Sequence, residues 1–336
     1  IIPLVDGTAT ISRLCRMGSF DMDRWIRSSG KPPRGADLVK VRRVKGLGAN
    51  LGRIVPVGRL GHIRRWVRIL AYWENGGPKN IDNLLRTVLG SYCGGNGPRP
   101  EAPESRPDHY IQLPGGPVDQ VLAADLDTWL RDHPLDRTLP LVVVLYYSGP
   151  RREASSGAAA ALIHELKGRA NVLPVATDGV ATLEVLKDLF GDDEGPTPEA
   201  IISLLWGRLD GGLPGSISEE TVDFLRRKDV LLFTAATLYQ REITAWESGV
   251  EGPSALESCA SVVLPELDGA LCPIPVLALD DPEGTDPDGV RTVTLDERIA
   301  TLAERALAWL KLRRTPRKER RIALIATDEP RGPTAM

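Results

Sequence analysis

The sequence predicts an α/β protein with an N-terminal, mainly helical region followed by a parallel-sheet α/β layer with helices on both faces. The first observation is length, because 336 residues are enough for two domains that each bury a core. The second is a segment at 94–107 with three Gly, four Pro and no apolar periodicity, which is typical of a linker. The third is the regular alternation, after residue 140, of short apolar runs with helical patterns.

The head region is expected to span residues 1–93. Apolar residues among polar ones predict a helix within 1–30, where Leu14, Met17, Phe20, Met22, Trp25 and Ile26 recur. Two further helices, one from about His62 and one over 78–92, are separated by the breaker Gly76-Gly77-Pro78. The aromatic side chains of the first of these, Trp66, Tyr72 and Trp73, are expected in the core.

The α/β domain is expected to span residues 108–280. After a helix at 121–130, the chain predicts strands at 141–147, 171–176, 200–205 and 230–234, with helices between them at 155–166, 181–190 and 219–227. Strand–helix–strand units at this spacing make a parallel sheet with right-handed crossovers. The loops at 148–150, 177–178 and 234–237 would then share the carboxyl edge of the sheet, where such folds bind ligands.

The stretch 260–279 is expected to form two buried strands joined by an acidic turn. Glu266 and Asp268 are two residues apart, so on extended backbone their carboxylates would point the same way. They are the candidate catalytic residues, and the alternative is a turn held by backbone hydrogen bonds.

Residues 281–336 are expected to hold a linking helix at 296–312 and a buried strand at 322–325, the first of a following, truncated domain. The acids Asp296 and Glu297 at the start of this helix and Arg313 and Arg314 at its end suit the helix dipole. On this interpretation the sequence is a fragment of a longer protein.

Composition narrows the function classes. No apolar run is long enough to span a membrane, and the four scattered cysteines favour a reduced cytoplasmic protein without a Cys-based metal site. The four histidines show no zinc-binding spacing, so no metal site is predicted. A net charge of −3 argues against a nucleic-acid binder.

Residues 31–68 are nevertheless strongly basic, with Asp37 as the one acid. Arg64, Arg65 and Arg68 are the candidate substrate-binding residues, since a guanidinium binds a carboxylate with two hydrogen bonds. A solvated helix face is the alternative. Gly46 to Gly52 lacks the spacing of a dinucleotide-binding loop, and the chain has no GxxxxGK[ST] motif for ATP.

Four segments resemble the porphyrin-binding large subunit of ATP-dependent metal chelatases, a family that includes the H subunit of magnesium chelatase and CobN, the large subunit of cobaltochelatase. Residues 72–85 resemble the family pattern YW-x-GG-x-x-x-N-L-x-N-x-L, and residues 202–211 resemble I-S-L-T-G-F-x-L-x-G-G. Residues 246–253 with 262–274 resemble W-x-x-S-x-x-G-L-x-P and then V-A-L-P-E-L-D-G-A-x-x-P-I. Residues 305–324 resemble R-A-x-x-W-x-x-L-x-R-K followed by E-K-K-x-A-I. The order is the family's, over nearly the whole chain.

Two departures bear on the branch of the family. Tyr147 is followed by Ser-Gly-Pro-Arg-Arg, without the histidine common there, and residues 328–336 lack the family's glycine-rich segment. The magnesium and cobalt branches therefore both stay open, with a slight lean toward magnesium.

The resemblance implies a tetrapyrrole substrate, AAA+ motor subunits as partners that hydrolyse ATP, and no covalently bound cofactor. The metal is a substrate: Mg²⁺ for protoporphyrin IX in chlorophyll biosynthesis, or Co²⁺ for hydrogenobyrinic acid a,c-diamide in cobalamin biosynthesis. Under it, Glu266 and Asp268 would accept pyrrole protons or hand over the metal, and the three arginines would bind propionates. Two alternatives stay open: a truncated, non-catalytic module that binds a tetrapyrrole or a partner, and an unrelated flavodoxin-like domain with a helical cap.

Overall fold

The computed structural model describes residues 16–18, 20–21, 59–104, 107–116, 125–148, 152–191, 195–210, 219–250, 252–280 and 291–323. The chain divides into two compact units. The first comprises Ile1–Gln112, Gly116–Asp125 and Tyr147–Glu153, and the second comprises Leu113–Gly115, Leu126–Tyr146 and Ala154–Met336. Each unit is described by itself.

The first unit begins, in its described part, with a pair of short antiparallel strands, β1 (Arg16–Met17) and β2 (Phe20–Asp21). The helix predicted here is therefore wrong at these residues. Gly18 has φ +57°, a left-handed backbone that lets the chain turn back between the strands. The other residues of the predicted helix lie outside the described part of the chain.

Two helices, α4 (Arg59–Asn75) and α5 (Pro78–Tyr92), form the centre of the first unit and confirm the predicted helical pair. Gly76 and Gly77 join them with φ values of +58° and +82°, and Pro78 begins α5, where a missing N–H has no cost. Ile69, Tyr72 and Leu84 are buried between the helices, and Trp73 packs against them. A two-residue strand, β3 (Tyr110–Ile111), follows later in this unit.

The segment after α5 is irregular, as its glycines and prolines predict, but it is hydrogen-bonded to the helix pair. The backbone N–H of Glu101 donates to Asn83 Oδ1 at 2.9 Å, and that of Glu104 donates to Asn80 Oδ1 at 3.0 Å. Asn80 and Asn83 are buried, with 1% and 5% exposure. Residues 100–104 of this segment therefore lie on α5, and we call them the strap.

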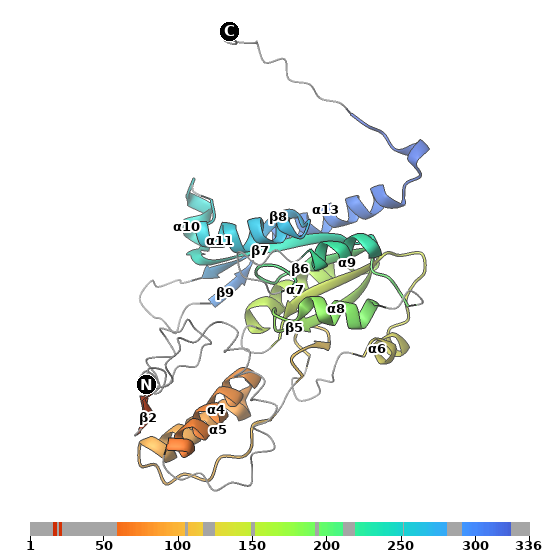
Figure 1. The fold of residues 1–336 in the computed structure, drawn as a ribbon. Coiled ribbons are helices and arrows are strands. Elements are labelled where there is room, and N and C mark those ends of the chain that lie inside the picture. Colours follow the sequence, from red (N-terminus) through yellow and green to blue (C-terminus); the bar gives the residue numbers. More distant parts are fainter. Residues whose placement is uncertain are drawn as a thin grey trace. The chain divides into compact units, whose positions relative to one another are not determined.

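The second unit is built on a twisted sheet that confirms the predicted parallel layer (Figure 1). Its strands are β4 (Leu141–Tyr147), β5 (Asn171–Thr177), β6 (Ala200–Ser203), β7 (Leu231–Glu242), β8 (Leu271–Asp280) and β9 (Arg291–Thr294). They follow the order β5-β4-β6-β7-β8-β9. Neighbours from β4 to β8 along this order are parallel, and β9 is antiparallel to β8. All seven residues of β4 are buried, as its unbroken apolar run predicts.

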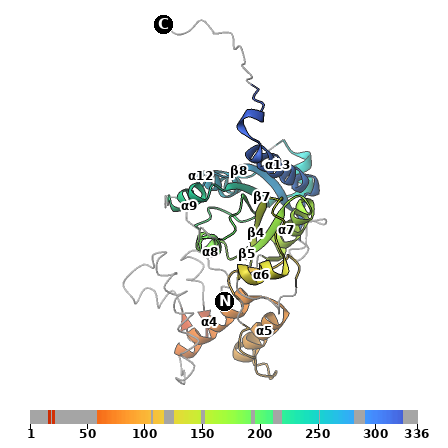
Figure 2. The same cartoon turned by 90° about the vertical axis from the view of Figure 1, so that its right-hand side faces the viewer.

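Helices cover both faces of this sheet (Figure 2). One face carries α7 (Arg152–Leu166) and α13 (Asp296–Arg314), and the other carries α8 (Thr182–Phe190), α9 (Glu220–Lys228) and α12 (Leu264–Leu267). The remaining helical segments are α6 (Leu126–Asp132), α10 (Ile243–Ser248), α11 (Ala255–Ser258), the π-helix η3 (Cys259–Val263) and the 3₁₀-helix η4 (Arg317–Glu319). The buried face of α13 holds five of the apolar residues that its periodicity predicts, namely Ile299, Leu302, Ala303, Ala306 and Leu310.

Residues 260–267 are helical, so the prediction of a strand there is wrong. Ser254 and Glu257 form a capping box that starts a helix, which continues through α11, η3 and α12. In η3 the N–H of Leu264 bonds to the carbonyl of Cys259, five residues back, and this change of register brings Pro265, which has no N–H, to the start of α12. The second predicted strand is confirmed as β8.

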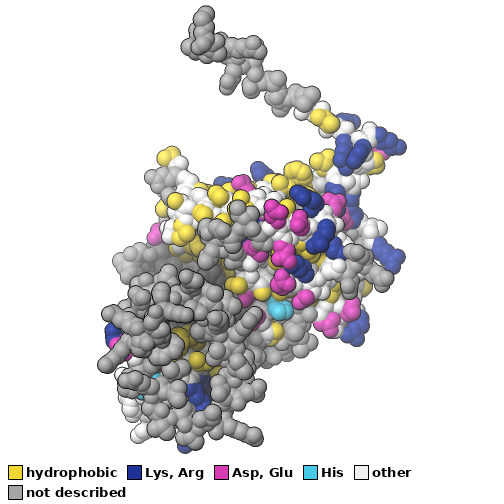
Figure 3. All heavy atoms as spheres, viewed as in Figure 1, with side chains coloured by type: hydrophobic (Ala, Val, Ile, Leu, Met, Phe, Trp, Pro, Cys, Tyr) yellow, Lys and Arg dark blue, Asp and Glu magenta, His cyan; other side chains and the backbone are white. Residues whose placement is uncertain are grey.

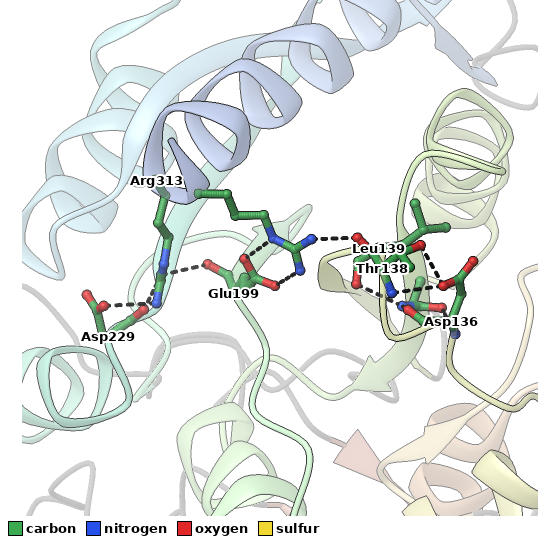
Figure 4. A network of polar contacts seen from close by, with 8 residues as sticks. Asp136, Thr138, Leu139, Glu199, Asp229 and Arg313 are labelled. Atoms are coloured by element: carbon green, nitrogen blue, oxygen red, sulfur yellow. Dashed lines mark hydrogen bonds and ion pairs between the residues drawn. The ribbon is translucent and has the colours of Figure 1, made fainter. Parts of the chain in front are cut away.

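The amino ends of the strands are tied together by arginines of α13 (Figure 4). Arg313 donates to the carboxylate of Asp229 at 2.9 Å and to the carbonyl of Glu199 at 3.3 Å. Arg314 donates to the carboxylate of Glu199 at 2.9 Å and to the carbonyl of Thr138 at 2.7 Å. We call these contacts the clasp. They hold the segments that lead into β4, β6 and β7 against the last turn of one helix.

Beyond α13, the strand predicted at 322–325 is absent from its two described residues, Ile322 and Ala323. The side chain of Ile322 is 86% exposed, so it lacks the neighbours that a buried strand requires. Residues 324 and 325 lie outside the described part of the chain. Across the residues that the structure describes, none of the helices combines the length and the apolarity needed to cross a membrane.

Candidate functional site

The loop after β6 and the helical segment 255–267 meet at the carboxyl end of β6. The N–H of Gly207, which has φ +82°, donates to the carbonyl of Ala260 in η3 at 2.9 Å. The N–H of Leu183, at the start of α8, donates to the carbonyl of Leu209 at 2.9 Å. Two of the four segments that carry the family resemblance, 202–211 and 262–274, are thus brought together. The sequence separates them by about fifty residues.

A buried ion pair joins these two segments. Arg208 donates from Nε and Nη2 to Oδ1 of Asp268 at 2.8 and 2.6 Å, and the N–H of Leu209 donates to Oδ2 at 3.0 Å. The two side chains are 3% and 0% exposed. Asp210 lies farther from the guanidinium, at 3.8 Å.

The environment of Asp268 perturbs its titration. Burial raises the pKa of its carboxyl, while the hydrogen bonds from Arg208 and Leu209 oppose that rise. Both carboxylate oxygens are occupied by donors of the neighbouring loop, so Asp268 is placed to hold the fold of this edge.

Glu266 has the opposite environment, because its residue is exposed in the last turn of α12. The expectation that the two carboxylates point the same way fails, since the backbone between them is helical and not extended. Of the two predicted catalytic carboxylates, only Glu266 is exposed to solvent.

A third carboxylate, which the sequence analysis missed, is buried beside this edge. Glu257 is 1% exposed and accepts hydrogen bonds from the backbone N–H groups of Gln240 and Ser254, both at 2.8 Å. It links β7 to the start of α11. The Ser-x-x-Glu spacing of a capping box at 254–257 is the signal that could have predicted it.

Buried hydroxyl groups collect on β7 and η3. Thr234, Thr237 and Ser261 are each at most 2% exposed, and their hydroxyls have no hydrogen-bond partner among the described residues. The pairing of β7 with β8 is interrupted at the same level, where Cys272 adopts a left-handed backbone with φ +52°. Unpartnered buried hydroxyls are uncommon in proteins, so these three are candidates for contact with a polar atom of a ligand or of water.

Aromatic and apolar side chains lie beside the same edge. The rings of Trp206 and Tyr239 make an edge-to-face contact with centroids 4.4 Å apart. Val250, Leu256, Val263 and Leu267 are all more than half exposed. Figure 3 shows hydrophobic side chains gathered over the α10–α11 end of this unit.

The polar side chains of another loop at the predicted carboxyl edge, 177–178, make hydrogen bonds within the protein. Asp178 Oδ1 accepts from the N–H groups of Val180 and Ala181 and so holds the turn before α8. The hydroxyls of Thr177 and Thr182 bond to each other at 2.8 Å. Gly149 and Pro150 lie outside the described residues.

The predicted substrate-binding arginines belong to α4 in the first unit. Arg64 and Arg65 are exposed. Arg68 is half-buried and donates to the hydroxyl of Tyr72 at 2.9 Å and to the carbonyls of Pro100 and Glu101 at 3.1 and 2.6 Å. In this structure its guanidinium is therefore engaged with the strap, whereas the other two face solvent.

The described residues contain no group of three or more His, Cys, Asp or Glu side chains that could hold a metal ion. Cys93, Cys259 and Cys272 carry free thiols.

Comparison with known proteins gives one family. The model of the CobN/Magnesium Chelatase family matches residues 70–336. The magnesium-chelatase H subunit of Cereibacter sphaeroides is 26% identical over 94% of this chain and 28% of its own length. The chloroplastic magnesium-chelatase subunit ChlH of Oryza sativa subsp. indica is 24% identical over 95% of this chain and 24% of its own. The aerobic cobaltochelatase subunit CobN of Pseudomonas aeruginosa is 26% identical over 78% of this chain and 20% of its own.

Among solved structures, the catalytic subunit of cobaltochelatase from Mycobacterium tuberculosis aligns with a TM-score of 0.48 and 20% identity, over 76% of this chain and 20% of that one. The chain thus spans about a quarter of the length of the curated relatives it matches.

Proposed function

This chain belongs to the CobN/Magnesium Chelatase family, and we propose that it forms a tetrapyrrole-binding part of the large subunit of a metal chelatase. The observation that carries the proposal is the family match over residues 70–336, which includes the carboxyl edge where Arg208 and Asp268 join two of the resembling segments. The proposed reaction is metal insertion into a tetrapyrrole. Magnesium into protoporphyrin IX is the first candidate, and cobalt into a corrin precursor is the second.

Insertion of a divalent ion into a tetrapyrrole releases two pyrrole N–H protons, so the site needs a base and oxygen atoms that can hold a hard cation. Under the proposal, Glu266 supplies such a carboxylate because it is exposed on α12. Asp268 is a positioning residue, since it fixes the end of α12 through Arg208. The metal is a substrate of this reaction.

Binding of the tetrapyrrole is proposed to use its flat apolar face and its acidic side chains. Trp206 and Tyr239 offer an aromatic surface at the carboxyl edge. A separate candidate site for carboxylates lies in the first unit, where Arg64 and Arg65 are exposed. The same role for Arg68 requires it to leave its strap carbonyls. AAA+ partner subunits are proposed to hydrolyse ATP, as the resemblance to the family implies; the lack of a phosphate-binding loop motif in this sequence is consistent with that.

The test of binding is a titration of the chain with deuteroporphyrin, followed by tryptophan fluorescence. Saturable quenching is expected. Trp206→Phe should remove a large share of the quenching if the ring binds at the carboxyl edge, whereas Trp129→Phe, on the separate helix α6, should leave it unchanged. Absence of saturable quenching would contradict tetrapyrrole binding.

The test of the carboxylate role uses the same titration and then metal insertion with added chelatase motor subunits. Glu266→Gln is expected to keep the fold and porphyrin binding and to lower the insertion rate by about 10²-fold, the lower end of general acid–base contributions. An exposed acid elsewhere, Glu304→Gln, is the control. Equal insertion by both variants would remove Glu266 from the mechanism, and binding without insertion by the wild type would leave a non-catalytic module.

A further inference from the structure

The strap recognised by α4 and α5 is held almost entirely through its main chain. Both the N–H and the carbonyl of Glu104 bond to the amide of Asn80, at 3.0 and 3.2 Å. The N–H of Glu101 bonds to Asn83, while its carbonyl accepts from Arg68 at 2.6 Å and from the hydroxyl of Tyr72. Hydrogen bonds to main-chain N–H and C=O groups are also what proteins use to bind peptides of variable sequence, because every residue other than proline offers both groups.

The asparagine side chains that make these contacts are also hydrogen-bonded to the backbone of α5 and of the turn before it. Asn80 Nδ2 also donates to the carbonyl of Gly76, and Asn83 Nδ2 donates to that of Lys79, both at 2.9 Å. Each amide is thereby oriented with its oxygen toward the strap. Tyr72 is fully buried in the core of the helix pair.

One side-chain contact adds a charge preference. Lys79 Nζ lies 2.6 Å from the carboxylate of Glu104 and 3.3 Å from that of Glu101. Lys79 donates both hydrogen bonds, and these bonds, the one to Glu104 first, raise its pKa. Two acids three residues apart on the strap are therefore matched by one cation on α5.

We propose that the α4–α5 pair is a groove for an extended acidic peptide, occupied in this structure by residues 100–104 of the chain itself. The recognising residues are Tyr72, Asn80 and Asn83, all of which belong to the segment 72–85 that resembles the family pattern. A partner peptide with an Asp or Glu pair at the same spacing displaces the strap and takes over its hydrogen bonds. Displacement also frees the guanidinium of Arg68.

The test uses the full chain with Glu101→Pro and Glu104→Pro, which removes the two N–H groups that Asn83 and Asn80 accept from. A labelled peptide of residues 99–105, Arg-Pro-Glu-Ala-Pro-Glu-Ser, is titrated and followed by fluorescence anisotropy. Saturable binding is expected. In the wild type the strap competes at an effective concentration on the order of millimolar, so binding should be at least about tenfold weaker.

Two matched controls separate main-chain from side-chain recognition. Glu101→Gln with Glu104→Gln keeps both N–H groups, so that chain should hold its strap and bind the peptide nearly as weakly as the wild type. A peptide with proline at both glutamate positions should not bind to any variant. Equal binding of this peptide, or no binding of the natural one to a folded double-proline variant, would overturn the proposal.

Amide hydrogen exchange of the wild type gives an answer even if the double-proline variant does not fold. The N–H groups of Glu101 and Glu104 should exchange faster than the amides of α4 and α5, because the strap opens locally while the helices stay folded. Exchange of the strap only together with the two helices would show that the groove cannot be vacated, and would equally overturn the proposal.

Discussion

The loss of Arg208 should destabilise the second unit strongly. In Arg208→Met, the carboxylate of Asp268 keeps only the N–H of Leu209 among its three donors, while remaining buried. Removing one partner of a buried ion pair typically costs about 3 to 5 kcal/mol. We expect about 3 kcal/mol, the lower end, because a buried carboxyl that has lost its cation can take up a proton instead.

The assay is urea unfolding followed by tryptophan fluorescence, in which Trp206 reports on the loop that carries Arg208. A matched control is Arg305→Met, which removes an exposed arginine of α13 and should change the free energy of unfolding by less than about 0.5 kcal/mol. The double variant Arg208→Met with Asp268→Asn removes both charges, so it should be more stable than Arg208→Met alone by about 1 kcal/mol or more.

The pH dependence of the same variant follows from the direction of the pKa shift. Burial already raises the pKa of Asp268 above its ordinary value of 3.8, and loss of Arg208 should raise it further. The folded state of the variant then binds more protons than its unfolded state. The loss of stability caused by Arg208→Met is therefore full above the folded-state pKa of Asp268, and it shrinks as the pH falls from that value toward 3.8. A cost below about 1 kcal/mol at neutral pH, or a double variant no better than the single one, would refute the role of the pair.

Three other variants test separate contacts. Glu257→Ala should cost about 1 kcal/mol in urea unfolding, because it leaves the part-buried backbone N–H groups of Gln240 and Ser254 without their acceptor. A cost below about 0.5 kcal/mol would mean that water replaces the carboxylate. Arg314→Met should lower the free energy of unfolding by less than about 1 kcal/mol, because the ion pair of Arg314 with Glu199 is partly exposed. This loss should shrink at high salt, which screens the pair, and an equal loss at low and high salt would contradict an electrostatic clasp. In an NMR titration, the pKa of Glu304 should lie below its ordinary value of 4.5, because Arg169 donates hydrogen bonds to its carboxylate. Arg169→Met should return the pKa of Glu304 toward 4.5. An unchanged pKa in this variant would exclude the contact in solution.

The elements that sequence periodicity predicted well are those whose burial is decided locally. β4 is an unbroken apolar run and lies inside the sheet between β5 and β6, and α13 shows an apolar stripe that becomes its buried face. The segment 260–267 was predicted as a strand because an apolar run followed by Pro265 fits a strand as well as a helix. What decides between them is the capping box at Ser254, which lies before the apolar run, together with the π-turn at 259–263.

The candidate site could be predicted only in part. Glu266 and Asp268 stand out in the sequence as two acids, yet their environments are opposite, because the helical turn between them points one into the interior and the other to solvent. The partner of Asp268 is Arg208, sixty residues earlier in the chain, and no local pattern connects them.

By itself the sequence determined the α/β class, the helical pair, the buried strands and the motifs that resemble the chelatase family, because these depend on the order of apolar residues and breakers along the chain. Only the tertiary structure decided which polar residues meet. It pairs Arg208 with Asp268, Arg314 with Glu199, and Asn80 with the backbone of Glu104. The physical reason is that a buried polar group must find its partner wherever the fold supplies one, and that place is set by the packing of the whole unit.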